Sequence, residues 1–534
     1  MKSEIKLLDC TLRDGGYLND WEFGKSNIVN IFERLVSAKV DIIETGFLDD
    51  RREFDENRTI FPDTASAEKI YGKLDKGDSM VVGMIDYGTC SADNLAPCSE
   101  SFLDGIRVIF KKHRMHEAID FCRMVKEKGY NVFVQAVSIT SYDDDEFDEL
   151  LGLVNGLEPY AFSLVDTYGL LHKGQLRHYF DIACADLKPS IGIGYHAHNN
   201  FQLAYANCIE LIDDPPHDRM LIVDGTLYGM GKSAGNTPIE LLVMHMNSNH
   251  GGKYHNSQIL EAIEVTILDL YRRIGWGYSF KFFLAASHDC HPNYVNYLMD
   301  TGKLSVKSIN EILDSLEGEK KLLYDRDYIK DLYFLYQKQH CADSDSVSDL
   351  IEALSGADVL IMGPGKNIYA EREKVLAYLS KKRITISINF IPEEYEVDYV
   401  FMSNAKRYVQ LSSALIEQKE KSKLIATSNI TRTHGEFDYT LNYGALLDEE
   451  ALMPDNPLIM LLRVLKKAGV SAIGLAGFDG YRETSVSNYV NPNMEYSYSS
   501  KEAENINEDT VRGIRKLELA VEPVFVTESL YEKL

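Results

Sequence analysis

Short apolar runs alternate with amphipathic stretches over the first half of the chain. In residues 26–38 and 116–128 the apolar residues recur three and four positions apart, as on the buried face of a helix. The runs between such stretches have the length and composition of buried strands. The pattern predicts eight strands, each followed by room for a helix, at 5–9, 41–46, 80–85, 105–110, 131–137, 161–166, 191–196 and 220–224.

Eight such units in about 250 residues match the size of a (β/α)8 barrel. We therefore expect an N-terminal TIM barrel over residues 1–254 as the catalytic domain. A doubly wound open sheet is the alternative, but it rarely needs eight regular units and binds its ligand at one switch point. In a barrel, polar residues that follow several strands would meet at one rim.

The pattern changes after the barrel. Residues 255–345 read as a helical extension without strands, and β and α alternate again beyond the polar run 343–346. The sequence thus predicts an α/β protein with a second, smaller, Rossmann-like domain over 346–534. Its strands are expected at 358–363, 384–389, 399–404, 423–428 and 471–477, and its clearest helix at 457–468.

Composition narrows the class of protein. Of 534 residues, 45% are hydrophobic and 26% charged, as in ordinary globular proteins, and the net charge of −26 argues against nucleic acid or an anionic membrane as partner. No apolar run reaches membrane-spanning length, and residues 1–4 lack the apolar core of a signal peptide. The eight cysteines form no Cys-x-x-Cys pair, which disfavours a disulfide scaffold or a zinc ribbon. We expect a cytoplasmic protein.

His196 and His198 are the most informative residues at the expected rim. At this spacing on a strand, two imidazoles point the same way and can converge on one ion. Asp14, after the first strand, would add a carboxylate. Two histidines and one carboxylate suit Mn²⁺, Mg²⁺, Co²⁺ or Zn²⁺. The alternative is a surface His-x-His pair that binds nothing.

Several motifs resemble the DRE-TIM metallolyase superfamily, and in particular its pyruvate aldolase branch, typified by 4-hydroxy-2-oxovalerate aldolase. The similar segments cover about residues 5–300 and occur in the family's order. They are Asp9-Cys10-Thr11-Leu12-Arg13-Asp14-Gly15, His196-Ala197-His198-Asn199, Asp224-Gly225-Thr226-Leu227-Tyr228-Gly229-Met230-Gly231 with Ala234-Gly235-Asn236 and Glu240, and Gly277-Tyr278-Ser279-Phe280.

The resemblance implies a metal-dependent carbon–carbon lyase. Asp14, His196 and His198 would hold a divalent ion, with Mn²⁺ the first expectation, and Arg13 would stabilise the enolate oxygen of a pyruvate-type 2-oxo acid. An aldehyde would be the other substrate. Glu44 would either support Arg13 or act as an acid or base. Asn236 would either be an outer ligand of the ion or only hold the loop after the eighth strand.

The remaining expectations concern the surroundings of this site. Asp166 and Thr167, at the end of the sixth strand, are expected to contact substrate. By the resemblance, the helical extension covers the active site and Tyr278 reaches back over it as a catalytic residue. We also expect a homo-oligomer.

The sequence departs from the aldolase branch at Tyr17, where that branch has a catalytic histidine. A phenol is a poor general base near neutral pH, so Tyr17 would act as a donor. Tyr278, Glu44, His288 and His291 are then the candidates for accepting the proton. The departure leaves two alternatives: a Claisen-type synthase that joins an acyl-CoA to a 2-oxo acid, or an inactive barrel that serves as a binding scaffold.

The C-terminal domain offers weaker motifs. Gly363 and Gly365 follow its first strand in a turn whose backbone N–H groups could face a phosphate. Together with 387–390, 400–404 and 475–480, this turn resembles the nucleotide-sugar folds of bacterial sialyltransferase-like and motility-associated glycosyltransferases. The resemblance implies a nucleotide or nucleotide-sugar site at these glycines. A domain for dimerisation or docking is the alternative.

Overall fold

The computed structural model describes residues 4–301, 304–321, 323–338, 341, 343–418, 420–430, 437–482, 488–492 and 498–533. The chain forms two compact units, Met1–Pro292 and Asn293–Leu534. This division falls inside the segment 255–345, which we expected as a separate helical extension. The three-domain division stays a prediction.

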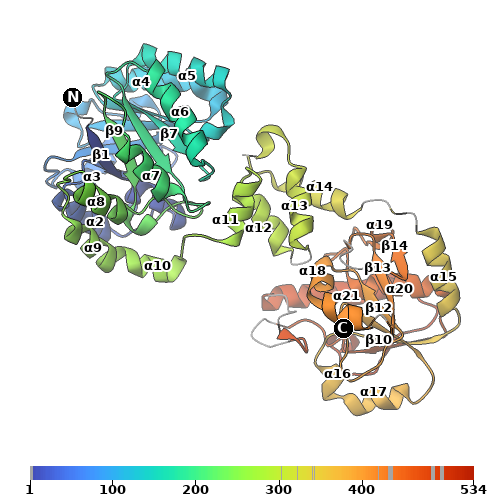
Figure 1. Ribbon diagram of the computed structural model, residues 1–534. Helices are drawn as coiled ribbons and strands as arrows, with labels where there is room; N and C mark the ends of the chain where they lie inside the picture. Colours follow the sequence, from blue (N-terminus) through green and yellow to red (C-terminus); the bar gives the residue numbers. More distant parts are fainter. Residues whose placement is uncertain are drawn as a thin grey trace. The chain divides into compact units, whose positions relative to one another are not determined.

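The first unit is the predicted barrel (Figure 1). Its parallel strands pair in sequence order, and β1 closes the ring by pairing with both β2 and β9. A two-residue strand, β3 (Ile60–Phe61), adds to the edge of β2. The barrel strands are β1 (Ile5–Asp9), β2 (Ile42–Leu48), β4 (Met80–Asp86), β5 (Gly105–Phe110), β6 (Asn131–Ala136), β7 (Ala161–Asp166), β8 (Gly192–Ala197) and β9 (Leu221–Gly225).

Helices follow most of the strands. The connection from β4 to β5 is an exception, because it contains two 3₁₀ turns and no α-helix. The barrel helices are α1 (Thr11–Asp14), α2 (Lys25–Ser37), α3 (Thr64–Tyr71), α4 (Met115–Glu127), α5 (Asp144–Leu157), α6 (Lys173–Asp186), α7 (Ala204–Asp213) and α8 (Ile239–Asn249). Beyond them come α9 (Asn256–Ala262), α10 (Leu268–Ile274) and α11 (Phe280–Ser287).

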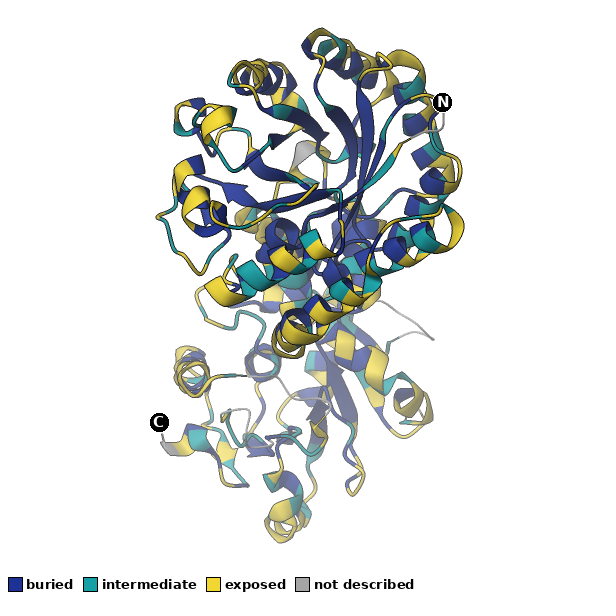
Figure 2. Cartoon of the chain, turned by 90° about the vertical axis from the view of Figure 1, so that its left-hand side faces the viewer, coloured by how far each residue is buried: buried dark blue, intermediate teal, exposed yellow. Residues whose placement is uncertain are grey.

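The period of two along each strand sorts the barrel residues into two sets. In β5, Ile106, Val108 and Phe110 belong to the large apolar core that includes the helices. The intervening Arg107 is equally buried, at 1% exposure. Because alternate side chains face opposite sides of a strand, Arg107 belongs to the barrel interior. Figure 2 shows that the barrel strands are buried along their length.

The second unit contains a seven-stranded parallel sheet, in the order β14-β13-β12-β11-β10-β15-β16. The core over one face includes residues of α15 and α20, and that over the other face includes residues of α17 and α18. The strands are β10 (Asp358–Met362), β11 (Ile384–Ile388), β12 (Tyr399–Met402), β13 (Lys423–Thr427), β14 (Tyr439–Leu441), β15 (Ala472–Ala476) and β16 (Val524–Phe525).

Helices precede and connect these strands, and α20 has the predicted bounds. Asp343, in the polar run 343–346, takes the N-cap position of α15. The helices are α12 (Pro292–Asp300), α13 (Val306–Asp314), α14 (Arg326–Gln337), α15 (Ser344–Leu354), α16 (Asn367–Ala370), α17 (Arg372–Leu379), α18 (Ala405–Gln418), α19 (Tyr443–Leu446), α20 (Pro457–Ala468) and α21 (Ser500–Lys516).

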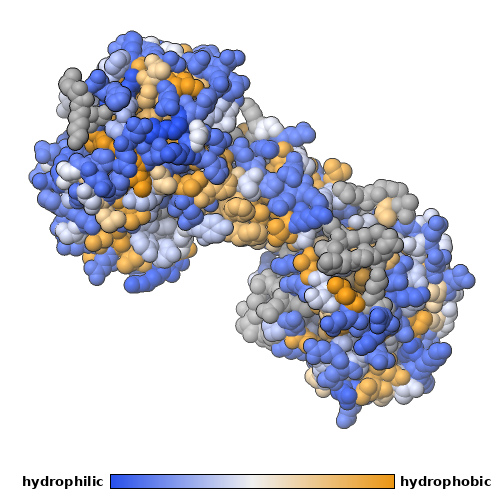
Figure 3. Space-filling model, in the orientation of Figure 1, coloured by the Kyte–Doolittle hydropathy of each residue, from blue (hydrophilic) through white to orange (hydrophobic). Residues whose placement is uncertain are grey.

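The surface is mixed in character (Figure 3). Exposed apolar side chains gather in the segment from α9 to α11, where Phe280 is 45% exposed and Phe283 is 38% exposed. No helix within the described residues is long and apolar enough to cross a bilayer.

Candidate active site

His196, His198 and Asp14 meet inside the barrel at the carboxyl ends of its strands. His196 is the inward-facing residue near the end of β8, His198 follows β8 by one residue, and Asp14 ends the short helix after β1. All three are at most 5% exposed. His196 Nε2 lies 3.2 Å from Asp14 Oδ2, and His198 Nε2 lies 3.8 Å from the same oxygen. One ligand atom from each residue therefore falls within 4.8 Å of the others.

The other nitrogen of each imidazole is held by a neighbouring residue. His196 Nδ1 lies 2.9 Å from Asp224 Oδ2, and His198 Nδ1 lies 3.1 Å from the Lys232 carbonyl oxygen. A proton on each Nδ1 would satisfy these acceptors and leave each Nε2 lone pair facing Asp14. Metal-binding histidines are usually oriented in this way, by a carboxylate or a backbone carbonyl on the second nitrogen.

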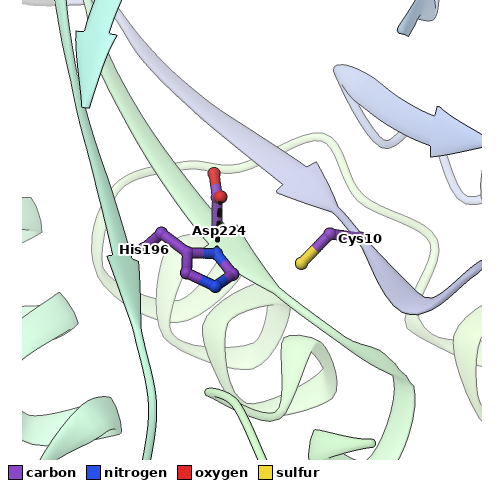
Figure 4. Close-up of side chains that lie close together, drawn as sticks. All are labelled: Cys10, His196 and Asp224. Atoms are coloured by element: carbon purple, nitrogen blue, oxygen red, sulfur yellow. Dashed lines mark hydrogen bonds and ion pairs between the residues drawn. The ribbon is translucent and has the colours of Figure 1, made fainter. Parts of the chain in front are cut away.

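Cys10, His196 and Asp224 form an overlapping group, shown in Figure 4. Here the Nδ1 edge of His196 is already bonded to Asp224. The Cys10 thiol donates to the Gly225 carbonyl at 3.5 Å, and burial raises its pKa well above the ordinary value. A protonated thiol is a poor metal ligand. The group around Asp14 is therefore the better candidate.

Two arginines and three carboxylates surround the histidines. Arg13 lies with Nε 2.7 Å from Glu44 Oε2 and with Nη1 2.6 Å from Asp14 Oδ2. Arg107, from the middle of β5, pairs with the same Glu44 oxygen at 3.2 Å and also with Asp224. Two guanidinium groups thus face three carboxylates in a buried region. An added cation would compensate the excess negative charge, since buried charges require partners.

The pKa values of Asp14 and His198 agree with a cation-binding arrangement, whereas Asp14 and Asp224 raise the pKa of His196 despite its burial. Burial alone would raise the pKa of Asp14, but Arg13 and the two imidazoles hold it well below the ordinary value. Burial lowers the pKa of His198 to about 4, so this imidazole is neutral and its Nε2 is available as a ligand at neutral pH.

Asn236 completes the polar lining of this pocket. Its Nδ2 lies 3.3 Å from His196 Nε2, and its buried Oδ1 has no hydrogen-bond partner among the described residues. A Cβ on Gly231 would lie only 1.7 Å from that oxygen, so glycine is required there. Asn236 also ties its loop, because its backbone N–H donates to the Gly229 carbonyl at 3.0 Å. The structure thus has a counterpart for each expected role of Asn236, as an outer ligand and as a residue that ties its loop. An oxygen without a partner, beside two imidazoles and a carboxylate, fits a divalent cation.

Comparison with known proteins identifies the barrel, because residues 4–267 match the HMGL-like family model. Over these residues the chain is therefore similar to the HMGL-like family. The chain is 26% identical over 278 residues to 4-hydroxy-2-oxovalerate aldolase of Pelotomaculum thermopropionicum, covering 45% of this chain and 69% of that protein. It is 25% identical over 246 residues to oxaloacetate decarboxylase of Mycobacterium tuberculosis, covering 44% of this chain and 68% of that protein.

Solved structures include similar folds. The HMG-CoA lyase of Bacillus subtilis has a TM-score of 0.40 and 15% identity, covering 52% of this chain and 95% of the lyase. The curated relatives are enzymes that include aldolases, a decarboxylase and synthases. The proteins to which this barrel is similar are thus enzymes that catalyse different reactions.

Tyr17 lies beside the group of ligands in this HMGL-like barrel. Its ring contacts Trp21 and Phe47 edge to face, and the Lys232 ammonium lies 5.4 Å from the ring centroid. Although Tyr17 is 39% exposed, desolvation by the surrounding residues raises the pKa of its phenol; Arg13 opposes this shift and nearby carboxylates add to it. Tyr17 therefore keeps its proton at neutral pH, which agrees with the expectation that it acts as a donor.

A cavity of about 450 Å³ opens beside Tyr17. Its walls combine aromatic rings with charged side chains, and both Tyr17 and Phe47 contribute to them. Arg13 lies close by, with its guanidinium carbon 5.8 Å from the Phe47 ring centroid. The lining residues are Tyr17, Trp21, Phe47, Asp49, Arg51, Arg52, Ile60, Asp86 and Thr89.

Asp166 and Thr167 tie loops together in the structure. The Asp166 carboxylate accepts hydrogen bonds from the backbone N–H groups of Leu170 and Leu171, and the Thr167 hydroxyl accepts one from the N–H of Ser138. Burial raises the pKa of Asp166 to about 6. The structure thus gives these residues structural partners, and their contact with substrate stays a prediction.

Tyr278 lies between α10 and α11 and is 58% exposed. Its neighbour Trp276 makes the contact with the barrel loops, because the indole N–H donates to the Tyr228 carbonyl at 2.9 Å. A catalytic role for Tyr278 stays a prediction. For His291, burial lowers the pKa to about 4, and Lys232 and Lys111 add to the shift. Its imidazole is therefore neutral at neutral pH.

The turn with Gly363 and Gly365 does not offer the free donors expected from the sequence. Gly363 N–H donates to the Ala476 carbonyl and Gly365 N–H donates to the Gly477 carbonyl, at 2.8 and 2.9 Å. The Asp479 carboxylate accepts from the N–H of Asn367 at 2.9 Å. The N–H groups of Gly363 and Gly365 are therefore not free to bind a phosphate, because carbonyls at the end of β15 and just after it accept their hydrogen bonds. A nucleotide site at these glycines stays a prediction without that support.

Sequence reasoning missed three residues that shape the barrel site: Arg107, Asp224 and Lys232. Arg107 was detectable as a lone charge inside an otherwise apolar strand, and Asp224 as the first residue of a recognised motif. Lys232 acts through its backbone, because its N–H donates to Asp14 Oδ1 at 3.0 Å and its carbonyl accepts from His198. No residue type predicts a backbone contact of this kind.

Proposed function

We propose that the HMGL-like barrel is a divalent-metal-dependent aldolase, which forms or cleaves a carbon–carbon bond through the enolate of a pyruvate-type 2-oxo acid. The observation that supports this most strongly is the convergence of His196 Nε2, His198 Nε2 and the Asp14 carboxylate beside a buried Arg13. An aldehyde would be the second substrate. We propose Mn²⁺ as the ion, with Mg²⁺, Co²⁺ and Zn²⁺ compatible with the same donors.

Asp14, His196 and His198 would hold the ion, and Asn236 would lie beside it. When bound, a divalent ion acts as a Lewis acid that stabilises the negative charge of an enolate oxygen. Arg13 would donate hydrogen bonds to the same oxygen, because Glu44 and Asp14 fix its guanidinium from two sides. We assign Glu44 as a positioning residue, since one of its oxygens contacts both Arg13 and Arg107.

The proton steps need one donor and one acceptor. Tyr17 would donate, because its phenol stays protonated. We propose His291 as the acceptor of the methyl proton of the 2-oxo acid, because it is neutral and within the electrostatic influence of Lys232. An anionic substrate beside Lys232 would raise the pKa of His291 toward its ordinary value and make it a better base.

Deuterium exchange into the methyl group of pyruvate, followed by NMR without CoA, tests the proposed reaction. We expect metal-dependent exchange that EDTA abolishes and added Mn²⁺ restores. His291→Asn should slow exchange, whereas His178→Asn, on the outer surface of α6, should not. Exchange of acetyl-CoA in place of every small 2-oxo acid would favour a Claisen-type synthase, and no exchange of either would favour an inactive scaffold.

Metal content tests the ligands separately from the reaction. His198→Ala should lower the bound metal sharply and leave the circular dichroism spectrum unchanged, because barrel rims tolerate substitution. Full metal occupancy in this variant, measured by elemental analysis, would contradict the assignment of His198.

A further inference from the structure

A cavity of about 100 Å³ lies in the second unit at the carboxyl end of its parallel sheet. Its lining comes from segments that directly follow four strands: Gly365 after β10, Asn389 after β11, Ser403 and Asn404 after β12, and Asp479 after β15. The four strands are neighbours in the sheet, in the order β12-β11-β10-β15. A single hollow thus collects polar groups from four loops.

The position of the cavity matches the usual ligand site of open parallel sheets. Successive strands run outward from β10 on one side up to β14, and the chain then returns to place β15 on the other side of β10. Ligands bind at the carboxyl ends of strands where the order reverses in this way. The reversal here lies between β10 and β15, and Gly365 and Gly477, which follow these strands, both line the cavity.

Glycine at position 365 allows the loop after β10 to approach the loop after β15 closely. A Cβ there would lie 2.5 Å from Asp479 Oδ1 and 2.6 Å from the Gly477 carbonyl oxygen. Asn389 holds the segment that follows β12. Its φ of 51° is unusual for a residue with a side chain. Its Oδ1 accepts from the N–H of Ser403 at 2.9 Å and from the N–H of Asn404 at 3.3 Å. Local backbone strain of this kind is common at ligand sites.

Two charged side chains, Arg407 and Asp479, are among the residues that line the cavity. Arg407, in the first turn of α18 after β12, is only 5% exposed and donates from Nη1 to Gln410 Oε1 at 2.8 Å. Asp479 follows β15. A cationic and an anionic side chain from two different segments thus contribute to one cavity.

Asp479 has an unused acceptor. Its Oδ2 accepts from the N–H of Asn367, but the buried Oδ1 has no hydrogen-bond partner among the described residues. Burial raises the pKa of this carboxyl to about 6, so at neutral pH it is predominantly an ionised acceptor. A ligand hydroxyl is the group that would satisfy it. A second carboxylate, Asp455, also lines the cavity and accepts from the Tyr443 hydroxyl at 2.9 Å.

We propose that this cavity binds a compact polyhydroxylated anion, with its phosphate or carboxylate on Arg407 and its hydroxyl groups on Asp479. Sugar phosphates and sugar acids share this chemistry. Arginine suits both anionic groups because its planar fork matches phosphate and carboxylate oxygens. The volume is below the about 300–1,000 Å³ of drug-sized pockets, which favours a small ligand over a nucleotide or nucleotide sugar.

Calorimetric titration of the full chain tests the proposal, with EDTA present so that the barrel holds no metal. The probes are D-ribose 5-phosphate, D-gluconate, D-ribose, inorganic phosphate and UMP. We expect ribose 5-phosphate or gluconate to bind more tightly than ribose and phosphate. If only ribose 5-phosphate binds, the ligand is a sugar phosphate. If only gluconate binds, the ligand is a sugar acid.

Two substitutions separate the two ends of the ligand. Arg407→Gln and Asp479→Asn should each weaken the binding by about 10- to 100-fold, as expected for a lost charge-assisted hydrogen bond. Arg123→Gln, on the exposed face of α4, is the matched control. Binding unchanged in both folded variants would overturn the proposal, as would binding of UMP when neither sugar anion binds.

Hydrogen exchange on the wild-type chain keeps the test valid if a variant does not fold. Ribose 5-phosphate or gluconate should slow amide exchange in the peptides that contain Ser403 to Arg407 and Gly477 to Gly480. Protection only elsewhere in the chain would overturn the assignment of this cavity.

Discussion

The imidazole of His196 is held at 2.9 Å from the carboxylate of Asp224, between Nδ1 and Oδ2. Asp224 in turn pairs with Arg107, so His196 is tied to a charge from the far side of the barrel interior. This contact orients Nε2 toward Asp14. The geometry of the candidate metal site therefore depends on residues that would not touch the ion.

Asp224→Asn should weaken metal binding by about 10- to 100-fold, the usual effect of removing the partner of a metal-binding histidine. The amide retains the shape of the side chain but loses the negative charge that stabilises the imidazole N–H. Isothermal titration with Mn²⁺ measures the effect. Asp144→Asn is the matched control, because Asp144 bonds His178 at 2.8 Å on the surface. Equal affinity in the wild type and Asp224→Asn would contradict the role of this contact.

Arg13→Lys should slow the exchange of the pyruvate methyl group by about 10²–10³-fold, as expected for one lost oxyanion donor. Lysine keeps a positive charge near Asp14 and Glu44, so the buried carboxylates retain a partner. Bound metal, measured in the same samples, should stay near the wild-type level. A normal rate of exchange would show that Arg13 has only a structural role.

Tyr17→Phe should slow aldol cleavage by about 10²-fold or more, as expected for loss of one general acid. Because burial raises the pKa of this phenol, its ionisation contributes nothing to the rate profile near neutral pH. The pH dependence between about 6 and 9 should therefore keep its shape in the variant. A shift of the profile, measured by steady-state kinetics, would show that Tyr17 titrates during the reaction.

Asp479→Asn should change how the second unit responds to pH. The folded-state pKa of Asp479 is about 6, raised by burial from the ordinary 3.8. Its ionisation therefore disfavours the folded state, and the free energy of unfolding should fall as pH rises from about 4 to about 6. The amide of Asp479→Asn does not ionise, so this variant should lack that part of the pH dependence of the free energy of unfolding. Calorimetric unfolding of the full chain at several pH values measures it, with Asp349→Asn on the exposed surface of α15 as control. An identical slope in both variants would contradict the prediction.

The periodicity of apolar residues determined both sheets. β5, β7 and α20 have the predicted bounds, because a buried strand or an amphipathic helix leaves a regular pattern in the sequence. The pattern missed β3, β14 and β16, which have two or three residues each. Strands this short are fixed by pairing with a neighbour rather than by their own composition. The resemblance also agreed with the family that the comparison identified for residues 4–267.

The tertiary structure decided which groups meet. His196 and His198 were predicted as a pair, since two residues on one strand face the same side. Their partners Asp224, on β9, and the Lys232 carbonyl, in the loop after β9, come near because β9 pairs with β8. Closure of the barrel through β1 then brings Asp14 to the same place. In the second unit, the sequence pointed to two glycines, but the reversal of strand order placed Arg407 and Asp479 at one cavity. Local sequence determines the elements, whereas contacts between residues distant in the chain determine the sites.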